Sequence, residues 1–252
     1  VPLIANHDYD GEISKIGDTV NIRKRPNVDI KDYVIGQDLV PQASLADEQI
    51  QLTIDYADYF DVPINDIQRF QTDIDFATVV LDEAGKALST KAEARVLQSI
   101  YTSATSTVSG GTLTAATVVQ MVLQCALKLN KLKVPKADRW MLVDPTTSYL
   151  LQLSDLKAAY LTGESSTPLR DYRALDKPIG GFQVYECLNL LTTSTTAKCI
   201  GGHKDAFCFA SQINDTETIR NQNDFGDLLR GLNVYGFKVT KPDAMVLLDV
   251  TG

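Results

Sequence analysis

Two stretches near the start of the chain alternate apolar and polar residues. The first spans residues 18–24 and runs into three consecutive cations, Arg23, Lys24 and Arg25. The second spans residues 49–56. Alternation of period two is typical of a strand with one buried and one solvated face. About two dozen residues without a helical period join the two strands, so we expect a projecting hairpin. A two-stranded hairpin needs another surface to lie on.

Apolar residues recur at helical spacing in two longer segments. Residues 64–102 predict one long helix, capped at Asn65 or Asp66 and bent or interrupted at Gly85 and the pair Ser89-Thr90. The small polar residues 102–111 predict a loop. A second helix is predicted over 114–131, with Thr114 as its cap and an apolar stripe of Ala116, Val119, Leu123, Ala126 and Leu127.

The rest of the chain predicts short strands and short helices. Strands are expected over 140–143, 182–185, 233–241 and 244–250, helices over 146–153 and 203–212, and a surface excursion over 154–180. Because strands and helices are mixed without a regular alternation, the chain is predicted to have an α+β fold.

The negative net charge of the chain argues against tight binding of nucleic acid. It has 252 residues, 44% hydrophobic and 22% charged, with 24 basic and 32 acidic side chains and a formal net charge of −8. These are globular values, and proteins that bind nucleic acid usually carry a positive surplus. The cations at 23–25 are therefore expected to meet carboxylates on protein rather than phosphates.

The cysteines and the apolar runs bear on the environment. Cys125, Cys187, Cys199 and Cys208 form no C-x-x-C pair, which favours buried free thiols in a reducing compartment. No apolar run approaches the ~20 residues of a membrane span, so we expect no membrane partner. The chain opens at Val1 rather than methionine, which predicts that a leading segment has been removed.

No set of residues forms a recognisable catalytic or metal-binding pattern. The C-x3-H-x4-C spacing of Cys199, His203 and Cys208 matches no standard zinc motif and lacks a fourth ligand. Asp73 and Asp75, two residues apart, would point to different faces of a helix. We therefore expect no enzyme, no metal and no cofactor, and keep a metal-dependent hydrolase that uses these residues as a remote alternative.

Six segments resemble the major capsid proteins of tailed bacteriophages, in the branch that many podoviruses and siphoviruses share. In chain order they are NHDYDGEISKIGDTVNI (6–22), QIQLTIDYADYFDVPINDIQRFQTD (49–73), KVPKADRWMLVDPTTSYLL (133–151), GGFQVYECLNL (180–190), GGHKDAFCFASQI (201–213) and RGLNVYGFKVTKPDAMVLLDV (230–250). No segment is a catalytic signature, and the specificity comes from their order and spacing.

The resemblance implies an HK97-like capsid fold with an extended hairpin loop, a long spine helix in a peripheral domain, and an axial domain. It divides the chain into the end of an N-terminal arm (1–16), the hairpin loop (17–63), the peripheral domain (64–113), the axial domain (114–229) and closing strands that return to the peripheral domain (230–252). The hairpin would lie across an adjacent subunit. Its expected contact residues are Arg23, Lys24, Arg25, Asp29, Lys31, Asp32 and Asp38.

The function implied by the resemblance is a non-enzymatic shell subunit. Copies would assemble into the hexamers and pentamers of an icosahedral head, with scaffolding, portal and decoration proteins as further partners. The head would enclose double-stranded DNA without sequence-specific binding. The protein would reside in the virion after assembly in the bacterial host cytoplasm. An encapsulin-type cellular compartment, which has the same fold, is the near alternative.

Overall fold

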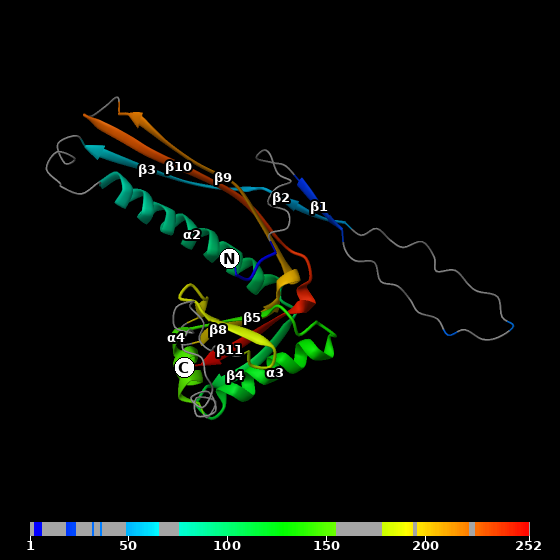
Figure 1. Ribbon diagram of the computed structural model, residues 1–252. Coiled ribbons are helices and arrows are strands. Elements are labelled where there is room, and N and C mark those ends of the chain that lie inside the picture. The colour runs from blue at the N-terminus through cyan, green and yellow to red at the C-terminus, as the bar shows by residue number, and fades with distance from the viewer. Residues whose placement is uncertain are drawn as a thin grey trace, which may run out of the picture.

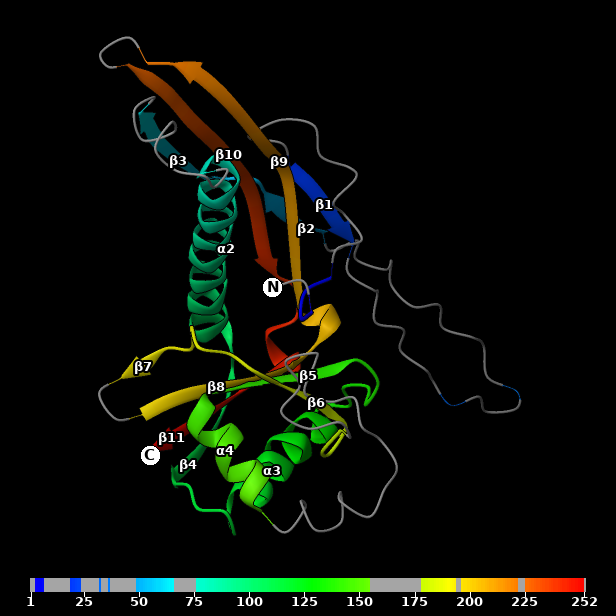
Figure 2. The ribbon, with the colours of Figure 1, turned by 60° about the vertical axis from the view of Figure 1, so that its left-hand side comes forward.

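The computed structural model describes residues 3–6, 19–23, 32, 36, 49–65, 76–154, 178–193, 196–221 and 225–251. The elements form two lobes (Figure 1). One lobe is elongated, with long strands lying along a long helix, and the other is compact, with two helices against a broader sheet. Figure 2 shows that the long helix α2 leads down from the elongated lobe to the compact one.

The elongated lobe is built on a three-stranded antiparallel sheet in the order β3, β10, β9. Helix α2 lies along one face of this sheet. A two-stranded antiparallel sheet of β1 and β2 lies near the end of the larger sheet that adjoins the compact lobe, which we call the root of the sheet. The elements are β1 (Thr19–Arg23), β2 (Gln49–Thr53), β3 (Tyr56–Asn65), α2 (Phe76–Ser103), β9 (Phe207–Arg220) and β10 (Gly226–Val239).

Helix α2 is anchored by its second half alone. Ala92, Val96, Leu97 and Ile100 are buried in the core between the lobes, whereas no residue from 78 to 91 is buried. The apolar residues of the first half therefore face the sheet without a closed core between them.

The long helix expected over 64–102 is confirmed from Phe76 onward, but its start is wrong. Ile64 and Asn65 end strand β3, because every residue from Tyr56 to Asn65 pairs with β10. Residues 66–75 lie outside the described part of the chain. The expected interruption is also wrong, since α2 continues through Gly85. A single glycine costs a helix only about 1 kcal/mol, and long-range packing of the second half outweighs it.

The compact lobe contains a mixed sheet in the order β4, β11, β8, β5, β6, with β7 paired to β8. β4 is parallel to β11 and β5 to β6, and the other pairs are antiparallel. Helices α3 and α4 cover one face, with Val118, Val122 and Leu151 in the core beneath. The elements are β4 (Ser106–Thr112), α3 (Val118–Lys131), β5 (Arg139–Val143), α4 (Pro145–Leu153), β6 (Phe182–Glu186), β7 (Thr192–Thr193), β8 (Thr196–His203) and β11 (Met245–Thr251).

Several expected elements of this lobe are confirmed. Strand β5 is buried along its whole length and ends at Asp144, whose carboxylate accepts hydrogen bonds from the backbone N–H groups of Thr146 and Thr147 and so caps α4. The strands expected over 182–185, 233–241 and 244–250 are present as β6, the end of β10, and β11. The 3₁₀ turn Pro242–Ala244 joins the last two.

Two other expectations are wrong, because pairing with distant strands overrides local composition. The loop expected over 102–111 is largely strand β4, which pairs with β11 at the edge of the sheet. The helix expected over 203–212 is a 3₁₀ turn, Lys204–Ala206, followed by the start of β9. Its apolar residues instead pair with β10.

The second helix is confirmed with a different start and a different buried face. α3 begins at Val118 because Thr114 O accepts hydrogen bonds from the N–H groups of Thr117 and Val118, closing a turn first. Leu123 and Leu127, expected in the buried stripe, are 46% and 51% exposed. The buried residues are Val118, Val122, Cys125, Ala126 and Leu129.

The surface excursion expected over 154–180 falls mostly on residues 155–177, outside the described part of the chain. The expected division into an arm, a loop and two domains stays a prediction. No helix in the described residues combines the length and the apolar character that crossing a bilayer requires.

Candidate subunit interface

The paired strands β1 and β2 confirm the base of the predicted hairpin. Thr19 pairs with Thr53 and Arg23 with Gln49, so the cation run begins where the described pairing ends. Of the seven expected contact residues, Arg23 is the last residue of β1 and Asp32 is exposed. The other five lie outside the described residues: Lys24, Arg25, Asp29, Lys31 and Asp38. The role of all seven stays a prediction.

The hairpin is fastened to the larger sheet by a small apolar core. Val20, Ile22, Leu52 and Ile54 are its buried residues on the hairpin side, as the period-two alternation predicts. On the sheet side they meet Cys208, Ala210 and Val234. The direction of the hairpin is therefore fixed at its root by apolar packing.

Gly236 of β10 allows the hairpin to approach this closely. A Cβ atom at this position would lie 2.5 Å from the backbone oxygen of Thr53 and 3.0 Å from the Cα of Ile54. Such distances are far inside van der Waals contact, and backbone atoms cannot move aside as a side chain can. Only glycine fits at this crossing.

On the opposite face of the sheet, a buried carboxylate joins β3 to the helix. Asp58 Oδ1 lies 2.7 Å from Lys91 Nζ, and Oδ2 lies 2.9 Å from Arg95 Nη1. The hydroxyl of Tyr235 on β10 donates to the same Oδ2 at 2.8 Å. Asp58 is 1% exposed, whereas Lys91 and Arg95 are 57% and 36% exposed. The helix thus brings two half-solvated cations to one buried anion.

The surroundings shift the pKa values of this cluster in opposite directions. Burial alone would raise the pKa of Asp58, but hydrogen bonds from Lys91 and Tyr235 and the charges of Arg95 and Lys91 outweigh it and hold the pKa below its usual value of 3.8. Burial, followed by the hydrogen bond to Asp58, raises the pKa of Tyr235 to about 12. At neutral pH Asp58 is therefore an anion beside the Arg95 cation, and Tyr235 is neutral.

Stacked rings continue the cluster along the root of the sheet. Tyr56 stacks on Phe237 with centroids 4.8 Å apart, and Arg95 lies 5.4 Å above the Tyr56 ring. Tyr235 stacks on Phe209 at 5.8 Å. These contacts join all three strands to α2 at one level.

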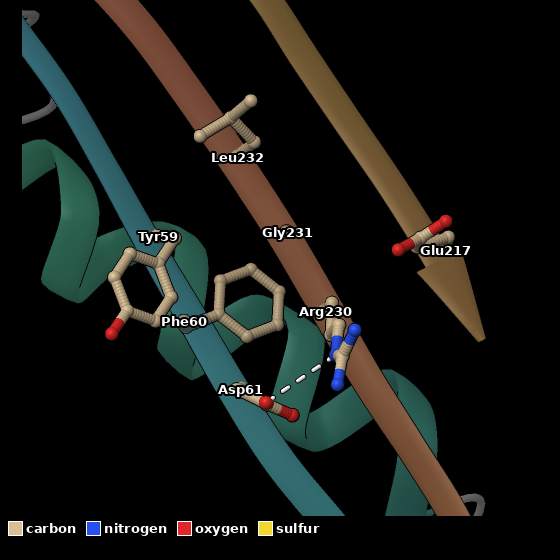
Figure 3. A pocket seen from close by; sticks show the side chains of 7 residues that line it. All are labelled: Tyr59, Phe60, Asp61, Glu217, Arg230, Gly231 and Leu232. Carbon is tan, nitrogen blue, oxygen red and sulfur yellow. Dashed lines mark ion pairs between the residues drawn. The ribbon is translucent and has the colours of Figure 1, made fainter. Parts of the chain in front are cut away.

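The part of the elongated lobe that lies farther from the compact lobe than the Asp58 cluster contains a cavity and a groove. A cavity of about 360 Å³ opens around Phe60, whose ring lies across Gly231, and a cross-strand pair of Arg230 Nε and Asp61 Oδ2 at 3.3 Å forms part of its wall (Figure 3). Tyr59, Glu217 and Leu232 complete it. A groove of about 780 Å³ separates the first half of α2 from the sheet. Its lining is mainly apolar and side-chain amide or hydroxyl, which suits contact rather than catalysis.

The residues weighed as a metal site are not brought together as ligands. Cys199 is buried in the compact lobe, and Cys208 is buried in the core under the hairpin. His203 Nδ1 accepts a hydrogen bond from the Asp205 N–H, which is a turn-capping role. No group of three or more metal-ligating side chains occurs among the described residues. Asp73 and Asp75 lie outside them.

The Asp58 cluster was not predicted from the sequence, although a signal existed. Lys91 and Arg95 stand four residues apart and flank Ala92 at the start of the buried stripe of α2. Cations at that spacing on the edge of a buried face indicate a carboxylate on the facing element.

Asp58→Asn is expected to lower the free energy of unfolding of the unassembled subunit by about 2 kcal/mol at pH 7, because it removes a buried anion that holds two charged hydrogen bonds. Since the folded pKa is depressed, the contribution is fully present above the unfolded pKa of about 3.9 and is lost as pH falls through the folded value. Urea unfolding at pH 7 and pH 3 measures this difference.

The matched control is Asp61→Asn on the same strand, whose partner Arg230 is exposed. We expect a loss below about 0.5 kcal/mol. Equal losses at the two positions, or a loss at Asp58 that persists unchanged at pH 3, would contradict the assignment.

Gly236→Ala is expected to destabilise the subunit by about 1–3 kcal/mol, because the new methyl group collides with the backbone at Thr53. Gly85→Ala is the control of opposite sign: an added Cβ there meets nothing within 4 Å, and alanine favours a helix by about 0.5–1 kcal/mol. Thermal unfolding measures the melting temperature of both variants. If both variants shifted it in the same direction, the close approach of the Thr53 backbone would not be the reason for glycine at position 236.

No protein-family model and no curated protein matches the chain. Several solved structures match it. The structure of Mycobacterium phage Che8 matches with a TM-score of 0.78 and 25% identity, over 97% of this chain and 89% of that chain. The capsid of Ralstonia phage GP4 matches at 0.72 and 14% identity, over 99% and 87% of the two chains. The capsid of cyanophage P-SCSP1u matches at 0.70 and 15%, over 95% and 84%.

A virus-like particle from Pyrococcus furiosus matches less well, with a TM-score of 0.57 and 12% identity over 94% of this chain and 87% of that chain. These three phage structures therefore share more of this chain's arrangement of strands and helices than the virus-like particle does. The α+β architecture with a paired hairpin base and a long helix under a three-stranded sheet is the HK97-like fold, and the expected resemblance of this chain to the major capsid proteins of tailed bacteriophages is confirmed.

Proposed function

We propose that this chain is a major capsid protein, which self-assembles into the shell of a tailed-phage head. The observation that carries the proposal is the match of nearly the whole chain, 97%, to 89% of a phage structure at a TM-score of 0.78. The role is structural, and the shell is made of copies of this protein.

The hairpin gives the proposal its contact mechanism. Its root is fixed on β9 and β10 by the apolar core around Leu52 and Ile54, and its distal residues carry both signs of charge. Arg23, Lys24 and Arg25 would contact carboxylates of the adjacent subunit, with Asp29, Lys31, Asp32 and Asp38 supplying the complementary charges. Charged contacts set register, and apolar strand residues add affinity.

The shell would have several further partners. Hexamers and pentamers would form the head, scaffolding and portal proteins would guide assembly, decoration proteins would bind outside, and double-stranded DNA would be enclosed. The net charge of −8 fits a container that does not bind its contents tightly. The mature protein would reside in the virion, after assembly in the host cytoplasm.

Two alternatives remain distinguishable by experiment. An encapsulin-type shell would co-purify with cargo peptides or flavin. A metal-dependent hydrolase would contain stoichiometric metal by elemental analysis. The described residues hold no cluster that would bind it.

The first test is expression of the chain alone, followed by negative-stain electron microscopy and mass photometry. We expect closed shells tens of nanometres across, or discrete hexamers and pentamers. A subunit that stays monomeric at high concentration, with and without additional N-terminal residues and a scaffolding protein, would contradict the proposed function.

The second test is the double variant Arg23→Glu and Arg25→Glu. We expect loss of assembly, or shells that dissociate at lower denaturant concentration, because the cations would now repel the carboxylates they contact. Arg23→Lys with Arg25→Lys is the matched control: it keeps the charge but not the bidentate geometry, and should assemble. Normal shells from the glutamate variant would refute this role of the hairpin.

A further inference from the structure

Four exposed lysines gather where helix α3 ends. Lys131 is its last residue, and Lys133 and Lys136 stand in the turn that follows. Lys204, distant in sequence, is brought beside them because its backbone N–H donates to Asp138 O at 3.1 Å. We call these four residues the lysine surface. None of the four has an ion pair with another residue in the described part of the chain.

The turn that presents these lysines is held in an unfavourable backbone conformation. Lys133 has φ 58° and Asp138 has φ 54°, the left-handed region that favours glycine. Lys133 follows the helix at the position where glycine is common: its N–H donates to Asn130 O, and the Val134 N–H donates to Leu129 O. A glycine at 133 would end the helix equally well without strain. Lysine at this position therefore indicates a role for its side chain.

A buried arginine supports the turn from below. Arg139 is 2% exposed, and its Nε donates to Pro135 O at 2.6 Å and its Nη2 to Asn130 Oδ1 at 2.9 Å. Among the described residues, its Nη1 has no hydrogen-bond partner and no carboxylate forms an ion pair with its guanidinium. The guanidinium fixes the shape of the turn and adds positive potential beneath the lysine surface.

An exposed apolar residue lies between two of these lysines in the chain. Leu132, between Lys131 and Lys133, is 46% exposed. An apolar centre with charged residues around it is the usual composition of a protein–protein contact. Asp138 is the one carboxylate in the turn, and it makes the surface less suited to a phosphate backbone.

The charge of the whole chain indicates what the lysine surface contacts. Each copy carries a formal charge of −8, so copies brought together in a shell repel one another unless cations face carboxylates where they touch. Resting on the proposed shell function, we propose that the lysine surface and Leu132 contact an acidic surface of a second copy of this chain.

The test reverses two of the charges outside the strained positions, with Lys131→Glu and Lys136→Glu together. We expect the subunit concentration needed for assembly at low salt to rise at least about tenfold. Lys86→Glu with Lys238→Glu is the control, because it makes the same change in net charge at exposed lysines elsewhere and should leave that threshold within about twofold of wild type. Sedimentation velocity over graded concentrations measures self-association even where shells do not close.

Lys133→Gly separates the contact from the fold. Removing the strain is expected to raise the melting temperature by about 2–4 °C, while removing the cation weakens assembly. A merely structural role for residue 133 would raise the melting temperature and leave the assembly threshold unchanged.

Unchanged self-association of the Lys131→Glu, Lys136→Glu variant would overturn the proposal. It would also be overturned if that variant assembled normally but lost binding of labelled double-stranded DNA that the wild type shows, since the surface would then contact nucleic acid. Failure of the wild type itself to associate would instead contradict the proposed function.

Discussion

The elongated lobe depends on a single buried anion. Asp58 receives Lys91 and Arg95 from the helix and Tyr235 from the neighbouring strand, so one carboxylate of β3 is bonded to both α2 and β10. The buried stripe of α2 begins at Ala92, beside these cations, and no residue of the helix from 78 to 91 is buried. The cluster therefore lies at the outer end of the buried stripe of the helix. The aromatic stack at Tyr56 and the hairpin core lie on its packed side.

The sequence predicted those elements whose signal is local. The alternation of Ile50, Leu52 and Ile54 identified β2 and its buried face, and Asp144-Pro145 identified the end of β5. It failed where the partner is distant. β9 has apolar residues in a pattern that also fits a short helix, and only pairing with β10 makes it a strand. The predicted strand ended at Tyr56, whereas β3 continues to Asn65 through ten pairs with β10.

The candidate contact surfaces show the same division. Runs of charge such as Arg23 to Arg25 can be found in a sequence, whereas the Asp58 cluster and the lysine surface are assembled from residues far apart. One backbone hydrogen bond, from the Lys204 N–H to Asp138 O, brings Lys204 to the turn that contains Lys136. In α3 a helical stripe was visible, but the choice of which side is buried follows from the sheet it covers, and the sequence pattern alone favoured Leu123 and Leu127 over Val122 and Leu129.

The groove of about 780 Å³ between the first half of α2 and the sheet has a mechanical consequence. A beam clamped at one end deflects more, under the same load, the longer its free length. The elongated lobe is clamped at the Asp58 cluster and is less closely packed beyond it, where the groove lies between helix and sheet, so we expect bending to concentrate in the outer part of the lobe and the root to stay rigid. One amino-acid sequence can then occupy sites of different curvature in a closed surface, because the difference in angle is absorbed by elastic compliance of the tip rather than by a change of fold.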